Sequence, residues 1–295
     1  MREMSVASIP RPIMVDIADL PQPSEAFDWV QAAAGPALIC RPLAALAPHL
    51  FTTRHWPLGS DGQGGDNGWA WEGVARALHV GRSELVRVRQ VHGTSVANAA
   101  HAHGMMIDAD IIVSGDAAVG VAVQAADCVP LLIADRQTGA VAAAHAGWRG
   151  LAAGVPDAAV VSLVREFGSD PGNLVAAIGP AIGACCYQVG EDVRQRFAST
   201  GLGRARLAEW FAAVPAVFTG NPPMPGVGRP IAGRWFFDAW TSARTQLEEV
   251  GVPPDQIFIA GLCTASHPGV LCSYRRDGPK AGRIAGAIRP APRRP

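Results

Sequence analysis

The sequence predicts an α/β protein, because short apolar segments typical of strands alternate with longer segments that have the apolar spacing of helices. Two buried strands are expected at residues 129–135 and 139–145, with a tight turn between them at residues 136–139. A half-buried strand is expected from Leu85 to a point close to His92, because apolar and polar residues alternate there. Helices are expected at residues 157–167, 190–198 and 238–250.

Four further strands are expected on the same grounds, at residues 107–115, 119–127, 174–180 and 257–263. Residues 1–45 are expected to form a partly irregular N-terminal extension with one strand near residues 37–42. Residues 57–68 and 219–233 are rich in glycine or proline and are expected to be loops. A chain of 295 residues is long enough for one large domain or for two that pack closely together.

Charge and cysteine usage argue against several classes of protein. Lys and Arg number 25, as do Asp and Glu, so no strong field attracts nucleic acid or an anionic membrane. The exception is the basic, proline-rich tail 289–295, which is expected to be disordered. The N-terminal segment mixes charges and prolines unlike a signal peptide, and no run of about 18 apolar residues predicts a membrane span. Six cysteines without a secretory signal do not suggest a disulfide framework, so a reducing cytoplasm is expected.

Three side chains stand out as possible partners in a site. Cys128 begins one predicted strand and His145 ends the next, so the two can lie at the same edge of a sheet, and His92 follows a third strand. Two imidazoles and one thiolate suit zinc, and three protein ligands would leave a fourth position open for catalysis. From the spacing alone, two structural histidines with a buried cysteine are an equal alternative. A nucleophilic pair of Cys128 and His145 is a third.

The sequence lacks the compact motifs of several large enzyme classes. The chain has no GxxxxGK[ST] phosphate loop, no complete dinucleotide fingerprint, no GxSxG nucleophile elbow and no HxE followed by PCxxC. Several polar residues remain in glycine-rich or apolar surroundings, and each taken alone is more often structural than catalytic. They are Arg54, Gln90, Asp127, Arg149 and Tyr187.

Six segments together carry a resemblance to a known family. They read, in order, RQVHGTSV, DADIIVSG, VQAADCVPLLIAD, AVAAAHAGWRG, AIGPAIGACCYQVGEDV and CTASHPGVLCSYRRDGPKAGRIA. These segments resemble the laccase-domain family, also called polyphenol oxidoreductases, which includes peptidoglycan editing factors and purine nucleoside phosphorylases. The resemblance covers roughly residues 50–288 and implies a catalytic domain at 46–288.

The resemblance implies a single α/β domain of layered mixed β-sheets flanked by helices, with His92, Cys128 and His145 as metal ligands. Zinc is the expected metal. Copper is a second possibility, although a blue-copper centre would want an axial Met and a multicopper cluster more than the eight histidines present. With this family in view, catalytic roles are expected for Asp127, Cys128 and His145, and substrate binding is expected for four other residues. These are Arg54, Gln90, Arg149 and Tyr187.

Members similar to this chain are phosphorylases of adenosine, inosine, guanosine and methylthioadenosine, and they also deaminate adenosine. The expected partners are therefore small molecules, purine nucleosides and phosphate, acted on by a monomer or small homo-oligomer. In deamination, zinc would lower the pKa of a water molecule to about 7 for attack on C6 of adenine, with Asp127 as the proton carrier. In phosphorolysis, Arg54 or Arg149 would hold the phosphate.

The chain departs from the family pattern after FTTR. Members usually continue with a Gly-Gly-Val-Ser turn and a downstream Ser-Leu-Asn, whereas this chain reads HWPLGSDGQGGDNGWAWEG. Cys272 also replaces an aromatic residue before SYRRDG. Three alternatives therefore stay open: an amidohydrolase that edits a peptidoglycan precursor through Cys128 and His145, a copper-dependent polyphenol oxidase, and an inactive relative that only binds a ligand.

Overall fold

Strand β8 (Val129–Asp135) is buried along its whole length, so the structure must cover both of its faces. In the computed structural model of the protein, Leu131 and Ile133 belong to one apolar cluster, whereas Leu132 and Ala134 belong to another. Successive side chains of a strand point to opposite faces. The sheet that contains β8 therefore lies between two separate cores.

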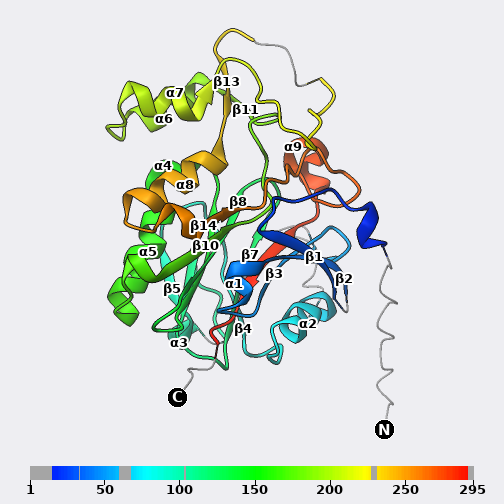
Figure 1. Cartoon of the computed structure of the whole chain (residues 1–295), viewed down its shortest axis with the longest axis vertical. Coiled ribbons are helices and arrows are strands. Elements are labelled where there is room, and N and C mark those ends of the chain that lie inside the picture. The colour runs from blue at the N-terminus through cyan, green and yellow to red at the C-terminus, as the bar shows by residue number, and fades with distance from the viewer. Residues whose placement is uncertain (1–14, 33, 60–67, 103, 227–230, 292–295) are drawn as a thin grey trace.

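The structure describes residues 15–32, 34–59, 68–102, 104–226 and 231–291, which form two six-stranded mixed sheets and a small three-stranded one (Figure 1). The first large sheet has the order β1 (Phe27–Ala32), β2 (Gly35–Cys40), β3 (His49–Thr52), β15 (Ile284–Ile288), β7 (Gly120–Ala125), β4 (Leu85–Arg87). The second has the order β14 (Ile257–Ile259), β10 (Leu174–Ile178), β8, β9 (Val141–Ala146), β6 (Ile111–Ser114), β5 (Val96–Asn98). The small sheet is β11 (Gln188–Gly190), β13 (Arg234–Phe237), β12 (Phe211–Ala212).

Helices cover the outer faces of the two large sheets, so the order of layers is helix, sheet, sheet, helix. Helix α2 (Gly68–Ala77) packs on the first sheet through Val74, and α5 (Val155–Phe167) packs on the second through Val160 and Leu163. The core between the sheets includes Phe51 from β3 and Leu132 from β8. The remaining helices are α1 (Arg41–Ala44), α3 (Ala99–Ala102), α4 (Trp148–Ala153), α6 (Glu191–Ala198), α7 (Arg204–Trp210), α8 (Ala239–Glu249) and α9 (Tyr274–Asp277), with 3-10 turns at Ile17–Asp19, Pro171–Asn173, Pro254–Gln256 and Gly278–Lys280.

The α/β prediction is confirmed, and so are the layered sheets flanked by helices that the family resemblance implied. Helices α5, α6 and α8 lie within a few residues of the predicted ranges. Local signals explain this agreement, since α5 is bounded by left-handed glycines at both ends and Asp238 caps α8 by accepting a hydrogen bond from the N–H of Thr241. The strand from Leu85 is shorter than predicted, because β4 ends at Arg87 and the chain then leaves the sheet.

The expected N-terminal extension contributes two strands to the first large sheet. The predicted strand near residues 37–42 is β2, and β2 pairs with β3 across the expected boundary after residue 45. Most of the expected loop at residues 57–68 and part of the loop at 219–233 lie outside the described residues, as do positions 292–295 of the expected disordered tail. Arg289, at the start of that tail, donates a hydrogen bond to the carbonyl of Ala117.

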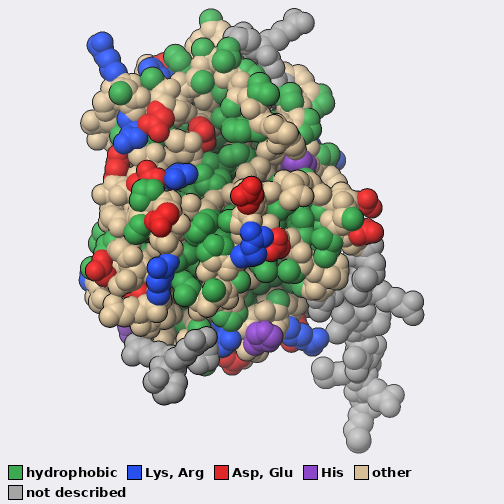
Figure 2. Space-filling model, in the orientation of Figure 1, with side chains coloured by type: hydrophobic (Ala, Val, Ile, Leu, Met, Phe, Trp, Pro, Cys, Tyr) green, Lys and Arg blue, Asp and Glu red, His purple; other side chains and the backbone are tan. Residues whose placement is uncertain are grey.

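Basic and acidic side chains are interspersed on the face shown in Figure 2, with apolar side chains between them. This mixture agrees with the formal net charge of zero, because no single sign of charge dominates that face. Among the described residues, none of the helices has both the length and the apolar character needed to cross a membrane.

Protonation of one buried histidine should destabilise the fold. His49 is 6% exposed, its Nε2 accepts a hydrogen bond from the N–H of Cys40, and burial lowers the pKa of His49 to about 4 despite its contact with the carbonyl of Ala47. Because the pKa of His49 is lower in the folded than in the unfolded protein, neutral His49 contributes its full share of the unfolding free energy above the unfolded pKa of about 6.5. That contribution is lost as the pH falls toward 4. We expect a loss of about 3 kcal/mol of unfolding free energy over that range.

Urea unfolding of the parent and of His49→Gln, at pH values on both sides of this range, measures the effect. The variant keeps an acceptor for the N–H of Cys40 but does not titrate, so its stability should fall less than that of the parent. Carboxylates elsewhere titrate alike in both proteins and cancel in the difference. Parallel curves for the two proteins would contradict the prediction.

Candidate metal centre

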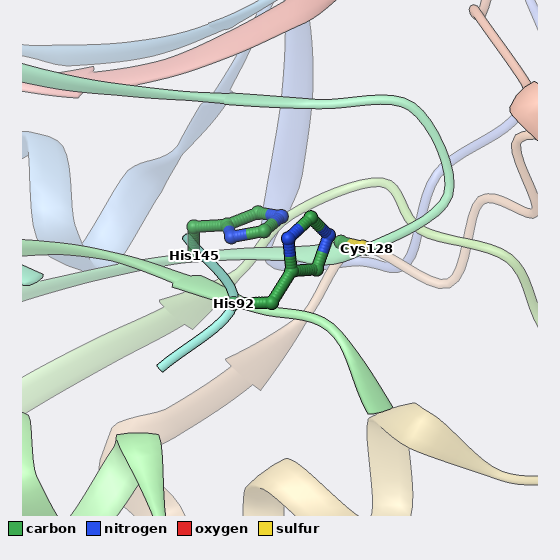
Figure 3. Close-up of side chains that lie close together, drawn as sticks. All are labelled: His92, Cys128 and His145. Carbon is green, nitrogen blue, oxygen red and sulfur yellow. The ribbon is translucent and has the colours of Figure 1, made fainter. Parts of the chain in front are cut away.

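The β8–β9 hairpin brings Cys128 and His145 to one edge of the second large sheet. Pro130 lies opposite His145 in the register of the hairpin, so Cys128, just before β8, reaches the end of β9. His92 comes from the segment between β4 and β5. One ligand atom from each of the three residues lies within 4.8 Å of the others, and Figure 3 shows the three side chains pointing toward one another. The two imidazole rings meet edge to face, with centroids 4.8 Å apart.

Asp110 holds the two histidines in this arrangement, and sequence reasoning did not identify it. Its side chain is fully buried, and its Oδ1 lies 2.8 Å from Nδ1 of His145. The same carboxylate accepts hydrogen bonds from the backbone N–H groups of Val91, His92 and Gly93, and the carbonyl of Asp110 accepts one from the N–H of His145. One residue therefore fixes the segment that carries His92 and the orientation of the His145 ring.

Two backbone features make room for the convergence. His92 has a φ of 60°, which lies in the left-handed region and is uncommon for a residue other than glycine. Gly147 has an ordinary extended φ of −72°, but a β-carbon there would stand 2.9 Å from Sγ of Cys128 and 3.1 Å from Cδ2 of His92. Glycine is required at position 147 for space next to the site.

The electrostatics of the three residues favour a thiolate. Burial opposes ionisation of Cys128, but the charge of His145 and hydrogen bonds from His145 and His92 outweigh it and lower the pKa of the thiol to about 6. Burial likewise opposes the charged form of His145, but Cys128 and Asp110 raise the pKa of His145 to about 9. Burial also disfavours ionisation of Asp110, yet hydrogen bonds from His145 and from Gly93 lower its pKa.

The donor set fits a single transition-metal ion. Zinc binds imidazole nitrogen at about 2.0–2.1 Å and thiolate sulfur at about 2.3 Å, so ligand atoms on one ion lie within about 4.5 Å of each other. Metal-binding histidines usually donate their second ring N–H to a carboxylate, which is the relation between His145 and Asp110. Three ligands from the protein leave room for a water molecule or a substrate atom.

Asp127 is held by the C-terminal part of the chain. It has a φ of 89°, so the chain bends sharply just before Cys128. Its carboxylate accepts hydrogen bonds of 2.6 Å from the hydroxyl of Thr264 and from the backbone N–H of Arg275. Burial raises the pKa of Asp127, and these hydrogen bonds oppose the shift.

Tyr187 lies near Asp127 and Cys128, and the charges of two arginines also act on it. The guanidinium carbon of Arg275 stands 5.3 Å from the centre of the Tyr187 ring. Burial raises the pKa of Tyr187, and the charge of Cys128 adds to this, whereas the charges of Arg275 and Arg149 oppose it. Arg149 is exposed, stacks on Trp148 at 4.4 Å and forms no ion pair with a residue that the structure describes. The site therefore has cationic groups on the side of Tyr187.

The other two predicted residues bind the protein backbone. The side-chain amide of Gln90 pairs with the backbone of Gln124 as a neighbouring strand would. It donates a hydrogen bond to the carbonyl of Gln124 and accepts one from the N–H of Gln124, both at 2.7 Å. The guanidinium of Arg54 donates a hydrogen bond to the carbonyl of Pro268. The structure thus brings His92, Cys128 and His145 together, whereas the hydrogen bonds of Gln90 and Arg54 hold neighbouring segments in place.

Sequence reasoning also overlooked Thr264 and Arg275. Both lie more than 130 positions from Asp127, so no local pattern indicated that they bind it. The signal for Asp110 was present but unused, because an aspartate stands directly before the apolar run of β6 and a charge is unusual at a buried position.

Comparison with known proteins extends these observations. A family described as multi-copper polyphenol oxidoreductase laccase matches residues 70–290. The purine nucleoside phosphorylase of Deinococcus radiodurans is 33% identical over 252 residues, which cover 82% of this chain and 88% of that protein. The purine nucleoside phosphorylase of Pseudomonas aeruginosa is 38% identical over 201 residues, covering 68% of this chain and 71% of that protein.

Solved structures share the fold. The hypothetical protein YfiH of Bacillus licheniformis superposes with a TM-score of 0.74 at 25% identity and covers 86% of this chain and 96% of its own. YlmD of Geobacillus stearothermophilus superposes with a TM-score of 0.71 at 27% identity, covering 90% of this chain and 99% of its own. The layered arrangement of sheets and helices is therefore common to these proteins.

Replacing Asp110 should weaken metal binding. We expect Asp110→Asn to lower the affinity for added zinc about 10- to 100-fold, the usual effect of losing a carboxylate that orients a metal-binding histidine. Competition with a chromophoric chelator measures this affinity. Asp108→Asn is the matched control, because Asp108 is an exposed residue of the same segment that pairs with Arg89. Equal zinc affinities for the two variants would show that Asp110 does not support the site.

Proposed function

The chain belongs to the family described as multi-copper polyphenol oxidoreductase laccase, and from this we propose that it is a zinc-dependent purine nucleoside phosphorylase that also deaminates adenosine. Relatives named purine nucleoside phosphorylase, at 33% and 38% identity, support this choice within the family. The observation that carries it is the convergence of His92, Cys128 and His145 near a tyrosine on which the charges of two arginines act.

Zinc is proposed rather than copper because of the number of ligands. In the part of the chain that the structure describes, His92 and His145 are the only histidines in a group of three or more potential ligands, whereas a multicopper cluster needs many. When bound, zinc acts as a Lewis acid and lowers the pKa of a water molecule to about 7. His92, Cys128 and His145 would hold it, and Asp110 would orient His145.

The arginines give the site a means to bind phosphate. Arg149 is exposed, and its charge acts on Tyr187, which also feels the charge of Cys128. A guanidinium binds phosphate oxygens through two parallel hydrogen bonds. We assign the phosphate to Arg149, with Arg54 as the second candidate. Purine nucleosides and phosphate are thus the proposed substrates, acted on in the cytoplasm by a monomer or small homo-oligomer.

Asp127 is the proposed proton carrier in deamination. Burial raises its pKa, which favours the protonated form of the carboxyl relative to an exposed aspartate. Hydrogen bonds from Thr264, Arg275 and Ser273 occupy only part of the acceptor capacity of a carboxylate, which has about four lone-pair positions. The remaining positions are available to a substrate or to water.

The proposed function is tested by the products formed by the full-length protein. With inosine or adenosine and phosphate, we expect free purine and ribose 1-phosphate, and with adenosine alone we expect inosine and ammonia. Both activities should disappear on chelation and return with zinc. Cys128→Ala and His92→Ala should bind no zinc and be inactive, because each removes a ligand.

Other products would point to the other members of the family. Release of serine or alanine from a nucleotide-linked muramyl substrate would identify a peptidoglycan-editing hydrolase, and oxidation of phenols with copper would identify a polyphenol oxidase. Zinc-loaded protein that transforms none of these substrates would be a ligand-binding relative. Each of these results would replace the phosphorylase assignment.

Arg149→Lys should raise the KM for phosphate more than the KM for inosine. Lysine keeps the charge but loses the planar pair of donors that matches a phosphate. Steady-state kinetics with each substrate varied in turn measures both constants. Arg54→Lys is the comparison, because Arg54 already donates to the carbonyl of Pro268. A larger increase in the KM for phosphate in Arg54→Lys than in Arg149→Lys would show that Arg54 is the residue that binds phosphate.

Asp127→Asn should slow deamination of adenosine by roughly 10²-fold or more while zinc stays bound, the usual effect of losing a general acid or base. Thr264→Val is the matched control, because it removes a hydrogen bond to Asp127 but leaves the carboxyl. We expect a smaller decrease in that variant. If both variants slow the reaction by the same factor, or if Asp127→Asn keeps the parent rate, Asp127 only positions its neighbours.

A further inference from the structure

A second group of potential ligands lies outside the site described above. Cys185, Cys186 and Cys263 are fully buried, all are free thiols, and their sulfur atoms lie within 4.8 Å of one another. The proposed phosphorylase chemistry uses none of them. We call these three residues the thiol cluster.

The fold creates the thiol cluster at the ends of two parallel strands, β10 and β14. Just beyond these strands Ala181 bridges to Cys263, which fixes the second loop against the first. The turn that follows Ala181 is closed by hydrogen bonds from the N–H groups of Cys186 and Tyr187 to the carbonyl of Gly183. This turn points both neighbouring cysteines toward Cys263.

Hydrogen-bond donors surround the sulfur atoms. The N–H of Gly183 donates to Sγ of Cys263 at 3.3 Å, and the N–H of Met224 donates to Sγ of Cys186 at 3.2 Å. The hydroxyl of Ser266 lies 3.8 Å and 3.7 Å from the sulfurs of Cys185 and Cys186. Hydrogen bonds from Cys185 and Cys186, together with the N–H of Gly183, lower the pKa of Cys263 and favour its thiolate, which is the form that binds metal.

From this geometry we propose that the thiol cluster binds one Cu(I) ion through three sulfur atoms. Two sulfurs on one ion, each at about 2.3 Å as in zinc thiolate sites, lie at most about 4.6 Å apart, so small movements of the thiols are sufficient. Soft thiolates select Cu(I) or zinc, and structural zinc is almost always four-coordinate. The group contains three ligands, and Cu(I) is stable with three. Cu(I) carries only one positive charge, so three thiolates around it keep a net negative charge. The N–H groups of Gly183 and Met224 would stabilise that charge.

A metal ion in the thiol cluster would stabilise the neighbouring site. Cys263 precedes Thr264, which donates to Asp127, and Cys186 precedes Tyr187, which contacts Arg275. An ion held by both loops would cross-link the two segments that carry these residues. The thiol cluster would therefore act as a structural site, closed to substrate, because all three cysteines are buried.

The test uses the full chain with Cys128→Ala, which removes the thiol of the first site, so that copper bound by sulfur alone must lie elsewhere. Anaerobic titration with Cu(I) against a Cu(I)-specific chelator measures binding, and X-ray absorption identifies the ligands. We expect one Cu(I) per chain with three sulfur neighbours. Adding Cys263→Ser should abolish this binding, whereas adding Cys40→Ser, a buried thiol outside the cluster, should not.

A second measurement does not depend on the folding of Cys263→Ser. Alkylation of the Cys128→Ala protein without denaturant, mapped by mass spectrometry, should show that Cu(I) protects Cys185, Cys186 and Cys263 more than Cys272, because only the first three sulfur atoms would bind the ion. Absence of bound Cu(I), copper with nitrogen ligands, a preference for zinc at the thiols, or equal protection of Cys272 would each overturn the proposal. None of these results bears on phosphorolysis, because the first site is already disabled.

Discussion

The buried carboxylate of Asp110 is the interaction on which the candidate site depends. It accepts three backbone N–H groups from the segment at Val91 to Gly93 and lies within hydrogen-bond distance of the ring of His145. A carboxylate that is fully buried is costly to desolvate, and several hydrogen bonds to it are needed to offset that cost. The same hydrogen bonds hold the segment that carries His92 against strand β9, which carries His145. The interactions that offset the desolvation cost of Asp110 are therefore the ones that position the two histidines.

The site also depends on the double layer of sheets. Strand β8 packs on helices through one face and on the first large sheet through the other, so the β8–β9 hairpin cannot tilt without disturbing two cores. Close packing of this kind limits the movement of Cys128 and His145 at the end of the hairpin. Rigid elements hold reactive groups more precisely than loops do. Gly147 then provides the space that the thiol and the ring of His92 occupy.

The C-terminal part of the chain completes the surroundings of the site. Thr264 and Arg275 bind the carboxylate of Asp127, and Arg275 also lies against Tyr187. The loops after β10 and β14 carry both Tyr187 and the thiol cluster. The chemistry proposed for the first site and the metal binding proposed for the thiol cluster therefore involve the same two loops, so an ion in the thiol cluster would hold in place the segments that carry Tyr187 and Thr264.

The sequence by itself determined the features that arise from local order. Helices α5, α6 and α8 and strands β8 and β9 were predicted because their periodicity, caps and turns lie within the segments themselves. The convergence of Cys128 and His145 was also predictable, since a tight turn joins their strands. Helices α2 and α7 and strands β1 and β15 were not predicted, because their short apolar patterns are not distinct from those of loops.

Only the tertiary structure decided which polar residues serve the site. Asp110 meets His145 across 35 positions, and Asp127 meets Thr264 across 137, so neither pair leaves a pattern in the sequence. Gln90 resembled a ligand-binding residue by its place beside His92, but the edge of β7 offered it a backbone partner at Gln124. A polar side chain binds whichever partner the packed chain brings near it, and burial makes that partner necessary. Residue types thus indicate the chemistry that is possible, and packing assigns it to particular atoms.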